Sequence, residues 1–278
     1  MISANRRSRV AICVRGRLGN QLFQISLGMH LESLGFEIVY DLSTSDTHKI
    51  EALNIFGLHE YMKSRIWTIS KFLPAPFGKY SKLAKFIRFF FGYRNFYQDM
   101  TPWASIPNTI QGATVLDGYW QNLNFTFLLH SYLKASEDRS VKRDKNKNLT
   151  LGVHIRRGDF IYEGNQLPIE FFMDQIQKIQ SNFEVRCTKI FSDDIEYCIQ
   201  NLKFESEIIF SENKEVTDDF YDLSSCDLIL MSRSTFSWWA SYLSNAKVFY
   251  PAPWFKTFPN LESKIIPITW IPILTKSE

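Results

Sequence analysis

The sequence has little of what marks several classes of protein. Its four cysteines form neither a CxxC pair nor the dense spacing of a secreted disulfide scaffold, which predicts reduced, buried thiols and a cytoplasmic protein. The net charge of +3 is too small for a protein that tracks nucleic-acid phosphates, so no nucleic-acid partner is expected. The apolar run at residues 10–14 is far shorter than the roughly 18 residues of a bilayer span. We therefore expect neither a signal peptide nor a membrane anchor.

Aromatic residues, by contrast, are abundant, at 15% of the chain with 24 phenylalanines. Many of them lie in the segment 64–97, where they alternate with lysines and arginines and where no aspartate or glutamate occurs. Such a segment is typical of a surface that sits on anionic lipid. A helical insertion that covers the first domain explains the same composition.

The alternation of apolar runs and helical periodicity indicates an α/β protein with two domains. Residues 10–14 read as a strand, a Gly-containing turn follows, and Phe23, Leu27 and Leu31 recur at helical spacing before a second strand at 36–42. Residues 134–148 are almost wholly polar and read as an exposed connector.

Beyond the connector, strands and helices alternate regularly, which predicts a parallel, doubly wound sheet. The residues 251–272 are rich in proline and predict irregular structure. The expected strands are 149–155, 188–191, 207–210, 227–231 and 247–250, and the expected helices are 168–183, 194–202, 217–224 and 235–243.

Charged residues gather after the predicted strand 149–155, where Arg156, Arg157 and Asp159 follow one another closely. Ligands of open parallel sheets bind at the carboxyl ends of the strands. A guanidinium is always charged, and its planar fork matches phosphate oxygens without the help of a metal ion. The arginines therefore favour a pyrophosphate site, although a structural ion pair between Arg157 and Asp159 fits the spacing equally well.

Hydroxyl side chains lie at the start of the predicted helix 235–243, where Ser234, Thr235 and Ser237 follow another strand. The first amides of a helix have no partner within the helix and favour an anion. A plain N-cap at Ser234 is the alternative interpretation.

Asp193 and Asp194 likewise follow a predicted strand and precede a helix. Three interpretations stay open for them. They cap the helix, they accept hydrogen bonds from a guanine edge or a ribose, or they chelate a divalent metal.

The turn at residues 16–21 has two glycines that allow a ligand to approach the backbone, yet it lacks the GxGxxG and GK[ST] spacings of nucleotide loops. A tight strand-to-helix turn is the simpler interpretation. His154 lies within an apolar strand and is either a base or a hydrogen-bonded structural group. The other histidines have no partner at ligand spacing, so no zinc site is expected: His30, His48, His59 and His130.

Taken together, four segments resemble the alpha-1,2-fucosyltransferases of glycosyltransferase family 11 in order and spacing. They are GRLGNQLFQ at 16–24, HIRRGD at 154–159, FSDD at 191–194 and STFSWW at 234–239. The resemblance covers residues 10–250, and a looser similarity extends to the alpha-1,6- and protein O-fucosyltransferases. Two departures add positive charge, because Arg233 stands where the family usually has asparagine and Arg17 where it often has glycine.

The resemblance implies a GT-B-type fold of two Rossmann-like domains that face a central cleft. Residues 1–140 would form the acceptor side, with the basic-aromatic segment 64–97 as an insertion, and residues 149–278 would bind GDP-fucose. It implies an inverting transfer of L-fucose to the 2-hydroxyl of a galactose-containing glycan, in surface-glycan or lipopolysaccharide O-antigen synthesis. No metal and no other cofactor is implied.

The resemblance also implies roles for particular residues. Arg156 would neutralise the β-phosphate of departing GDP, and Asp159 is the candidate general base, unless it orients Arg157. The residues implied in donor binding are Asn20, His154, Arg157, Asp193, Asp194, Ser234, Thr235 and Ser237.

Two other functions remain compatible with these residues. One is transfer of a related GDP-deoxyhexose such as GDP-colitose, and the other is non-catalytic binding of a nucleotide or a glycan. If the segment 64–97 binds anionic lipid, the enzyme would be peripheral on the inner face of the cell membrane, close to a lipid-linked glycan acceptor.

Overall fold

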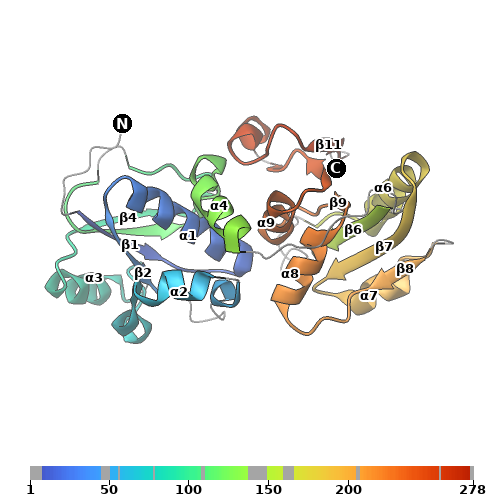
Figure 1. Ribbon diagram of the computed structural model, residues 1–278. Coiled ribbons are helices and arrows are strands. Elements are labelled where there is room, and N and C mark those ends of the chain that lie inside the picture. The colour runs from blue at the N-terminus through green and yellow to red at the C-terminus, as the bar shows by residue number, and fades with distance from the viewer. Residues whose placement is uncertain are drawn as a thin grey trace. The chain divides into compact units, whose positions relative to one another are not determined.

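The computed structural model describes residues 8–44, 51–55, 57–77, 79–107, 110–136, 149–158, 166–204, 207–256 and 258–275. The chain divides into two compact units, Met1–Glu137 and Asp138–Glu278. Each unit is built around one parallel β-sheet (Figure 1). None of the helices in the described part of the chain combines the length and the apolarity that a bilayer crossing needs.

The first unit contains a five-stranded sheet, which we call sheet A. All its strand pairs are parallel. In spatial order the strands are β3 Ile66–Trp67, β2 Glu37–Asp41, β1 Arg9–Cys13, β5 Thr114–Gly118 and β4 Asn95–Asp99. The α-helices are α1 Leu18–Ser33, α2 Leu58–Lys63, α3 Ser81–Phe90 and α4 Phe127–Ser136, with short 3-10 turns η1 Glu51–Asn54, η2 Thr68–Phe72 and η3 Leu123–Phe125.

The predicted first strand-turn-helix unit is confirmed. Strand β1 is buried along four of its five residues, and helix α1 is apolar on most sides and therefore buried along nearly its whole length. Gly16, with φ of +73°, makes the turn between them, and Gly35, with φ of +93°, ends the helix as its amide donates to the Glu32 carbonyl. The chain then enters β2.

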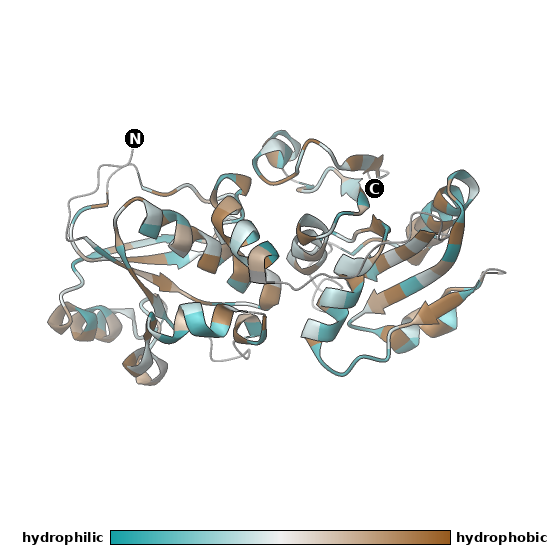
Figure 2. Cartoon of the chain, in the orientation of Figure 1, coloured by the Kyte–Doolittle hydropathy of each residue, from teal (hydrophilic) through white to brown (hydrophobic). Residues whose placement is uncertain are grey.

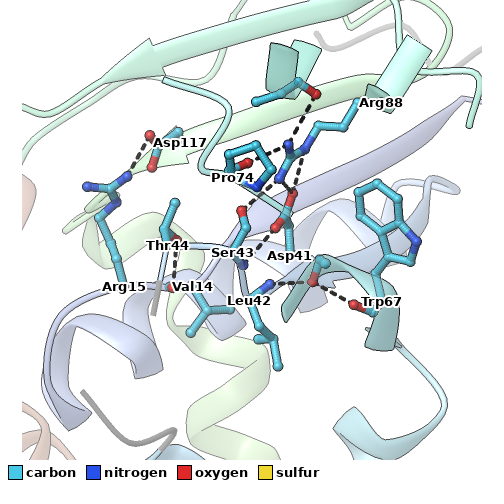
Figure 3. A network of polar contacts seen from close by, with 12 residues as sticks. Val14, Arg15, Asp41, Leu42, Ser43, Thr44, Trp67, Pro74, Arg88 and Asp117 are labelled. Atoms are coloured by element: carbon cyan, nitrogen blue, oxygen red, sulfur yellow. Dashed lines mark hydrogen bonds and ion pairs between the residues drawn. The ribbon is translucent and has the colours of Figure 1, made fainter. Parts of the chain in front are cut away.

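The segment 64–97 supplies more than the helix that the sequence suggested. It contributes both edge strands of sheet A, β3 and β4, in addition to α3. The side chain of Arg88 fixes α3 to the sheet, since its Nε and Nη2 donate to Asp41 Oδ2 at 2.9 and 2.7 Å (Figure 3). Nη2 also donates to Ser43 Oγ at 2.7 Å, and both members of the ion pair are fully buried.

The second unit contains a six-stranded parallel sheet, sheet B, and here the predicted alternation of strands and helices is confirmed. The strands in spatial order are β11 Ile271–Leu274, β10 Lys247–Ala252, β9 Leu228–Leu230, β6 Leu149–Ile155, β7 Val185–Ser192 and β8 Ile208–Phe210. The helices are α6 Ile169–Asn182, α7 Ile195–Asn201, α8 Val216–Ser225 and α9 Thr235–Leu243.

The proline-rich tail is more ordered than its composition predicts. It forms the 3-10 helix η4, Pro259–Lys264, and then strand β11, which pairs with β10 at the edge of sheet B. Pro272 lies in β11 opposite Tyr250. Proline lacks an amide hydrogen, and an edge strand tolerates that loss because one of its sides needs no ladder bond.

The four cysteines are buried and free, as predicted: Cys13, Cys187, Cys198 and Cys226.

Candidate functional site

The strongest candidate site lies at the carboxyl edge of sheet B. Strand β6 has β7 on one side and β9 on the other, so the sheet reverses its direction of growth between β6 and β9. Ligands of open α/β sheets bind at such a switch point. Three strand ends meet there, and they carry Arg156 and Arg157, Asp193 and Asp194, and the turn 232–237.

The register between β6 and β7 brings the two arginines onto the two aspartates. Ile155 is opposite Ser192, so the next residue pairs along the two strands are Arg156 with Asp193 and Arg157 with Asp194. Arg156 Nη1 lies 2.9 Å from Asp193 Oδ2. The other carboxylate oxygen of Asp193 accepts the backbone amide of Arg157, also at 2.9 Å. Asp193 therefore orients both the side chain of Arg156 and the turn that follows it.

Arg157 is held from two sides. Its Nε donates to Asp194 Oδ2 at 3.0 Å, and its guanidinium lies over the ring of Tyr197, 3.2 Å from the ring centroid. Asp194 Oδ1 in turn accepts the Tyr197 amide, so Asp194 caps helix α7 as well. The cap interpretation of Asp194 is thus confirmed. The donor-binding role of the two aspartates stays a prediction, and both carboxylates are engaged by arginine in this structure.

Gly158 allows this close arrangement. A β-carbon at this position would overlap with the Asp193 Oδ2 atom that pairs with Arg156. The absence of a side chain at Gly158 therefore lets the chain turn directly beside the ion pair.

His154 links the ends of β6 and β9. Its Nδ1 lies 2.7 Å from Ser232 Oγ, and its ring packs against Phe236 with centroids 5.0 Å apart. Burial and, secondarily, the charge of Arg156 lower the pKa of His154 to about 3. The ring is therefore neutral at physiological pH. The structural interpretation of His154 is confirmed, and its donor-binding role remains a prediction.

The turn before helix α9 has the predicted cap. Ser234 Oγ accepts the amide of Phe236, at 3.3 Å. The hydroxyl of Ser237 is buried and lies 3.3 and 3.1 Å from the carbonyls of Ser232 and Ser234. Ser237 thus stabilises the turn from inside, while Thr235 is half-buried. The binding of a pyrophosphate by this turn stays a prediction.

Arg233, in the turn between β9 and α9, binds the C-terminal tail of the second unit. Its Nε donates to the Pro253 carbonyl at 2.9 Å, and its Nη2 donates to Thr275 Oγ1 at 2.8 Å. The side chain is buried, and burial lowers its pKa. Arg233, where the sequence departs from the family pattern, therefore links the C-terminal tail to the turn that follows β9.

Asn20, at the start of α1 in the first unit, was predicted to reach the donor. Its Oδ1 accepts Gln121 Nε2 at 3.1 Å, and its side chain packs close to Gly16. The amide of Leu18, at the start of the same helix, donates to Glu51 Oε2 at 2.8 Å. The carboxylate of Glu51 thus occupies the place at the N-terminus of α1 where an anionic ligand would bind.

Sequence reasoning missed a second set of polar residues, at the carboxyl edge of sheet A. Arg15 Nη2 donates to Asp117 Oδ2 at 2.7 Å (Figure 3), and Gln98 Nε2 donates to the same oxygen at 2.8 Å. These residues belong to no common motif. The available signal was that Arg15 and Asp117 each lie at the carboxyl end of a buried, apolar strand.

Asp159, the candidate general base, lies outside the described residues. Within the described ranges, no three histidine, cysteine, aspartate or glutamate side chains gather in a way that would hold a metal ion. The absence of a metal requirement stays a prediction.

One family pattern covers nearly the whole chain. The sequence pattern of Glycosyl transferase family 11 matches residues 7–271. An alpha-1,2-colitosyltransferase of Escherichia coli is 25% identical over 287 residues, which cover 90% of this chain and 93% of that protein. The O-antigen biosynthesis glycosyltransferase WbnK, also of Escherichia coli, is 24% identical over 303 residues, covering 93% and 98% of the two chains.

Among solved structures, the crystal structure of POFUT1 in complex with GDP is similar, with a TM-score of 0.50 and 12% sequence identity. The similarity covers 89% of this chain and 99% of that one. At this level of identity it shows the fold alone, which is the GT-B type with two Rossmann-like units.

Proposed function

Because this chain belongs to glycosyl transferase family 11, and is thus a glycosyltransferase, we propose that it moves L-fucose from GDP-fucose to the 2-hydroxyl of a galactose-type acceptor. The transfer would invert the anomeric carbon and serve surface-glycan or lipopolysaccharide O-antigen synthesis. The observation that carries the donor side of this proposal is the pair of oriented arginines, Arg156 and Arg157, at the switch point of sheet B.

The mechanism follows from where charge develops. An acceptor hydroxyl attacks the anomeric carbon of fucose while GDP departs from the opposite face, so negative charge grows on the β-phosphate. Arg156 is fixed by Asp193 before any ligand arrives, and donors that are already oriented stabilise such charge without reorganisation. Asp159 remains our choice for the base that accepts the proton of the acceptor hydroxyl.

The remaining donor contacts are assigned to the same edge. The start of α9, with Ser234 and Thr235, offers helix amides to the pyrophosphate. Arg157, stacked on Tyr197, would take the second phosphate or the guanosine, with Asp194 close by. His154 is neutral and would contribute through Nε2, because Nδ1 is engaged with Ser232.

The experiment is a GDP-release assay with GDP-fucose and a panel of β-galactosides, with and without EDTA. Arg156→Ala should lower kcat about 10²-fold or more, because it removes one preorganised donor. Arg186→Ala is the matched control, since Arg186 is an exposed arginine of β7 in the same unit. Near-normal turnover by Arg156→Ala would remove Arg156 from the mechanism, and loss of wild-type activity in EDTA would overturn the metal-independent mechanism.

A second donor, GDP-colitose, has its own support, because a relative that matches 90% of this chain is an alpha-1,2-colitosyltransferase. Colitose differs from fucose in lacking the 3-hydroxyl. A site that hydrogen-bonds this hydroxyl rejects the sugar without it by roughly 10⁴-fold, whereas an apolar pocket discriminates only weakly. The ratio of kcat/KM for the two donors therefore decides which is the substrate.

We further propose that the first unit binds an anionic membrane through the aromatic surface of α3, which would bring it to a lipid-linked acceptor. Arg88 and Ala84 are buried, whereas the apolar residues elsewhere on α3 and in η2 are exposed. Helix α3 accordingly carries brown, hydrophobic segments in Figure 2. No aspartate or glutamate occurs between Glu60 and Asp99, so the surrounding charge is positive. The residues of this surface are Ile69, Phe72, Tyr80, Leu83, Phe86, Phe89, Phe90 and Phe91.

Phe72 is 88% exposed and Phe90 is 72% exposed, and a patch of exposed apolar side chains marks a site of contact with a membrane or a protein. Co-sedimentation with phosphatidylcholine vesicles, with and without phosphatidylglycerol, tests the proposal at low and high salt. The double variant Phe72→Ser and Phe90→Ser should lose binding, whereas Phe127→Ser, which changes an exposed phenylalanine of α4, should not. No binding of the wild type to anionic vesicles at low salt would end the idea.

A further inference from the structure

The carboxyl edge of sheet A holds one arginine in a fixed position. The backbone amide of Arg15 donates to Gln24 Oε1 at 2.9 Å, and its Nη2 donates to Asp117 Oδ2 at 2.7 Å. Asp117 is fully buried and also accepts Gln98 Nε2, while Gln24 donates to the Gly118 carbonyl. Helix α1 thus holds the backbone of Arg15, while β5, supported by β4, holds its guanidinium through Asp117.

Part of this arginine remains available to a ligand. The Arg15 side chain is 22% exposed, although the carboxylate that holds it has no exposure. Within the described residues, Nη1 of Arg15 has no hydrogen-bond partner. An arginine that is rigidly supported on one side and open on the other loses little conformational entropy when it binds a ligand.

Among the described residues, Arg15 and Asp117 each have a further buried polar atom with an unmet hydrogen bond, and Trp120, three residues after Asp117, has another. Arg15 Nε, Asp117 Oδ1 and Trp120 Nε1 are buried, and none has a hydrogen-bond partner in the part of the chain that the structure describes. A buried polar atom without a partner costs roughly 1–3 kcal/mol, so a ligand that supplied the missing hydrogen bonds would be stabilised here. Trp120 also has a φ of 56°, a left-handed conformation that bulky residues rarely adopt.

The charges at this edge select against a phosphate. The positive charge of Arg15 is matched by Asp117, and the N-terminus of α1 is already occupied by the carboxylate of Glu51. Arg17 is exposed beside them, so the four charges sum to zero. A phosphate bound here would be repelled by the carboxylates of Asp117 and Glu51. An uncharged ligand with hydroxyl groups meets no such repulsion and satisfies the open guanidinium.

We propose that Arg15 and Asp117 form a subsite for a neutral pyranoside, in which Arg15 Nη1 donates to a sugar hydroxyl and buried Asp117 keeps the guanidinium in place. This inference rests on the proposed function, in which the neutral pyranoside is the β-galactoside acceptor. Arg15 is the binding residue, and Asp117 is a positioning residue.

The test uses two variants that do not leave a buried charge without its partner. Arg15→Lys keeps the charge opposite Asp117 and removes the planar fork. The double variant Arg15→Gln and Asp117→Asn removes both charges together. The control is Arg9→Lys, since Arg9 lies at the other end of β1 in an exposed ion pair with Glu37.

In steady-state transfer from GDP-fucose to lactose, both Arg15 variants should raise the KM for lactose about tenfold or more, because hydrogen bonds from a charged donor are lost. The KM for GDP-fucose, donor hydrolysis without acceptor and the thermal midpoint should stay close to wild-type values. A purely structural role would lower the thermal midpoint and leave the KM for lactose unchanged, and that result would overturn the proposal.

Saturation-transfer NMR with methyl β-galactoside in the presence of GDP tests the subsite without turnover. The wild type should show transfer to the glycoside, and both Arg15 variants should lose it while Arg9→Lys retains it. If the wild type binds the glycoside but releases no GDP from GDP-fucose, either with or without acceptor, the proposed function fails and the subsite stands. If it hydrolyses GDP-fucose but binds no glycoside, the subsite is wrong.

Discussion

Acidification should destabilise the second unit through His154. Burial and the nearby charge of Arg156 lower its pKa to about 3, whereas an unfolded chain has a histidine pKa near 6.5. As the pH falls below 6.5, the unfolded chain takes up a proton that the folded protein does not, so stability falls with pH and the loss levels off below about 3. Between about pH 7.5 and pH 5, this difference in proton binding lowers the free energy of unfolding by roughly 2 kcal/mol.

Urea unfolding at these two pH values measures the effect. In His154→Gln the new side chain does not titrate and keeps a polar atom near Ser232. On acidification, the free energy of unfolding of this variant should therefore fall by about 2 kcal/mol less than that of the wild type. His59→Gln, which changes an exposed histidine, should keep the wild-type dependence. The wild type and His154→Gln share every other titrating group, so the contributions of those groups cancel between these two proteins. Equal losses for the wild type and His154→Gln would refute the assignment of His154 as a buried, neutral ring.

Three further substitutions test particular contacts. Gly158→Ala should displace the Asp193 carboxylate, so that Arg156 loses its fixed orientation. Calorimetry should then show GDP binding weakened about tenfold, with a nearly unchanged thermal midpoint, and an unchanged affinity would contradict this. Arg88→Leu should cost about 3–5 kcal/mol in urea unfolding because it leaves buried Asp41 unpaired, and Asp41→Asn in the same chain should restore part of that loss. Arg233→Met should lower stability by about 1–3 kcal/mol through two lost hydrogen bonds, without reducing GDP affinity; weaker GDP binding would place Arg233 in the donor site.

Much of sheet B could be predicted from the sequence because each element leaves a periodic signal. The stripe of Ile169, Phe172, Ile176 and Ile179 is buried along α6, as its spacing predicted. The segment 64–97 gave no such signal for its strands. β3 has two residues, and β4 lies at an edge and is only partly buried, so neither carries a continuous apolar run. Aromatic composition alone therefore suggested a helix and concealed both edge strands.

The sheet edge at which the candidate residues lie could be predicted, whereas their pairing could not. Arginines after one strand and aspartates after another were visible in the sequence. Which arginine meets which aspartate depends on the register of β6 against β7, a long-range property that no local pattern encodes. The same limit explains why Arg15 and Asp117 were missed, because they are 102 residues apart and meet only when β1 pairs with β5.

Both sheets present arginine at their carboxyl edges in the same way, with an aspartate bound to each guanidinium. In sheet B the partners of Arg156 and Arg157 are partly exposed, at 18% and 38%, so a diphosphate would compete with carboxylates for the same cations. In sheet A the partner of Arg15 is fully buried. The first arrangement suits a ligand that must leave as an anion, because the returning carboxylates repel it. The second suits a neutral ligand, since the carboxylate never reaches the surface and serves only to hold the arginine.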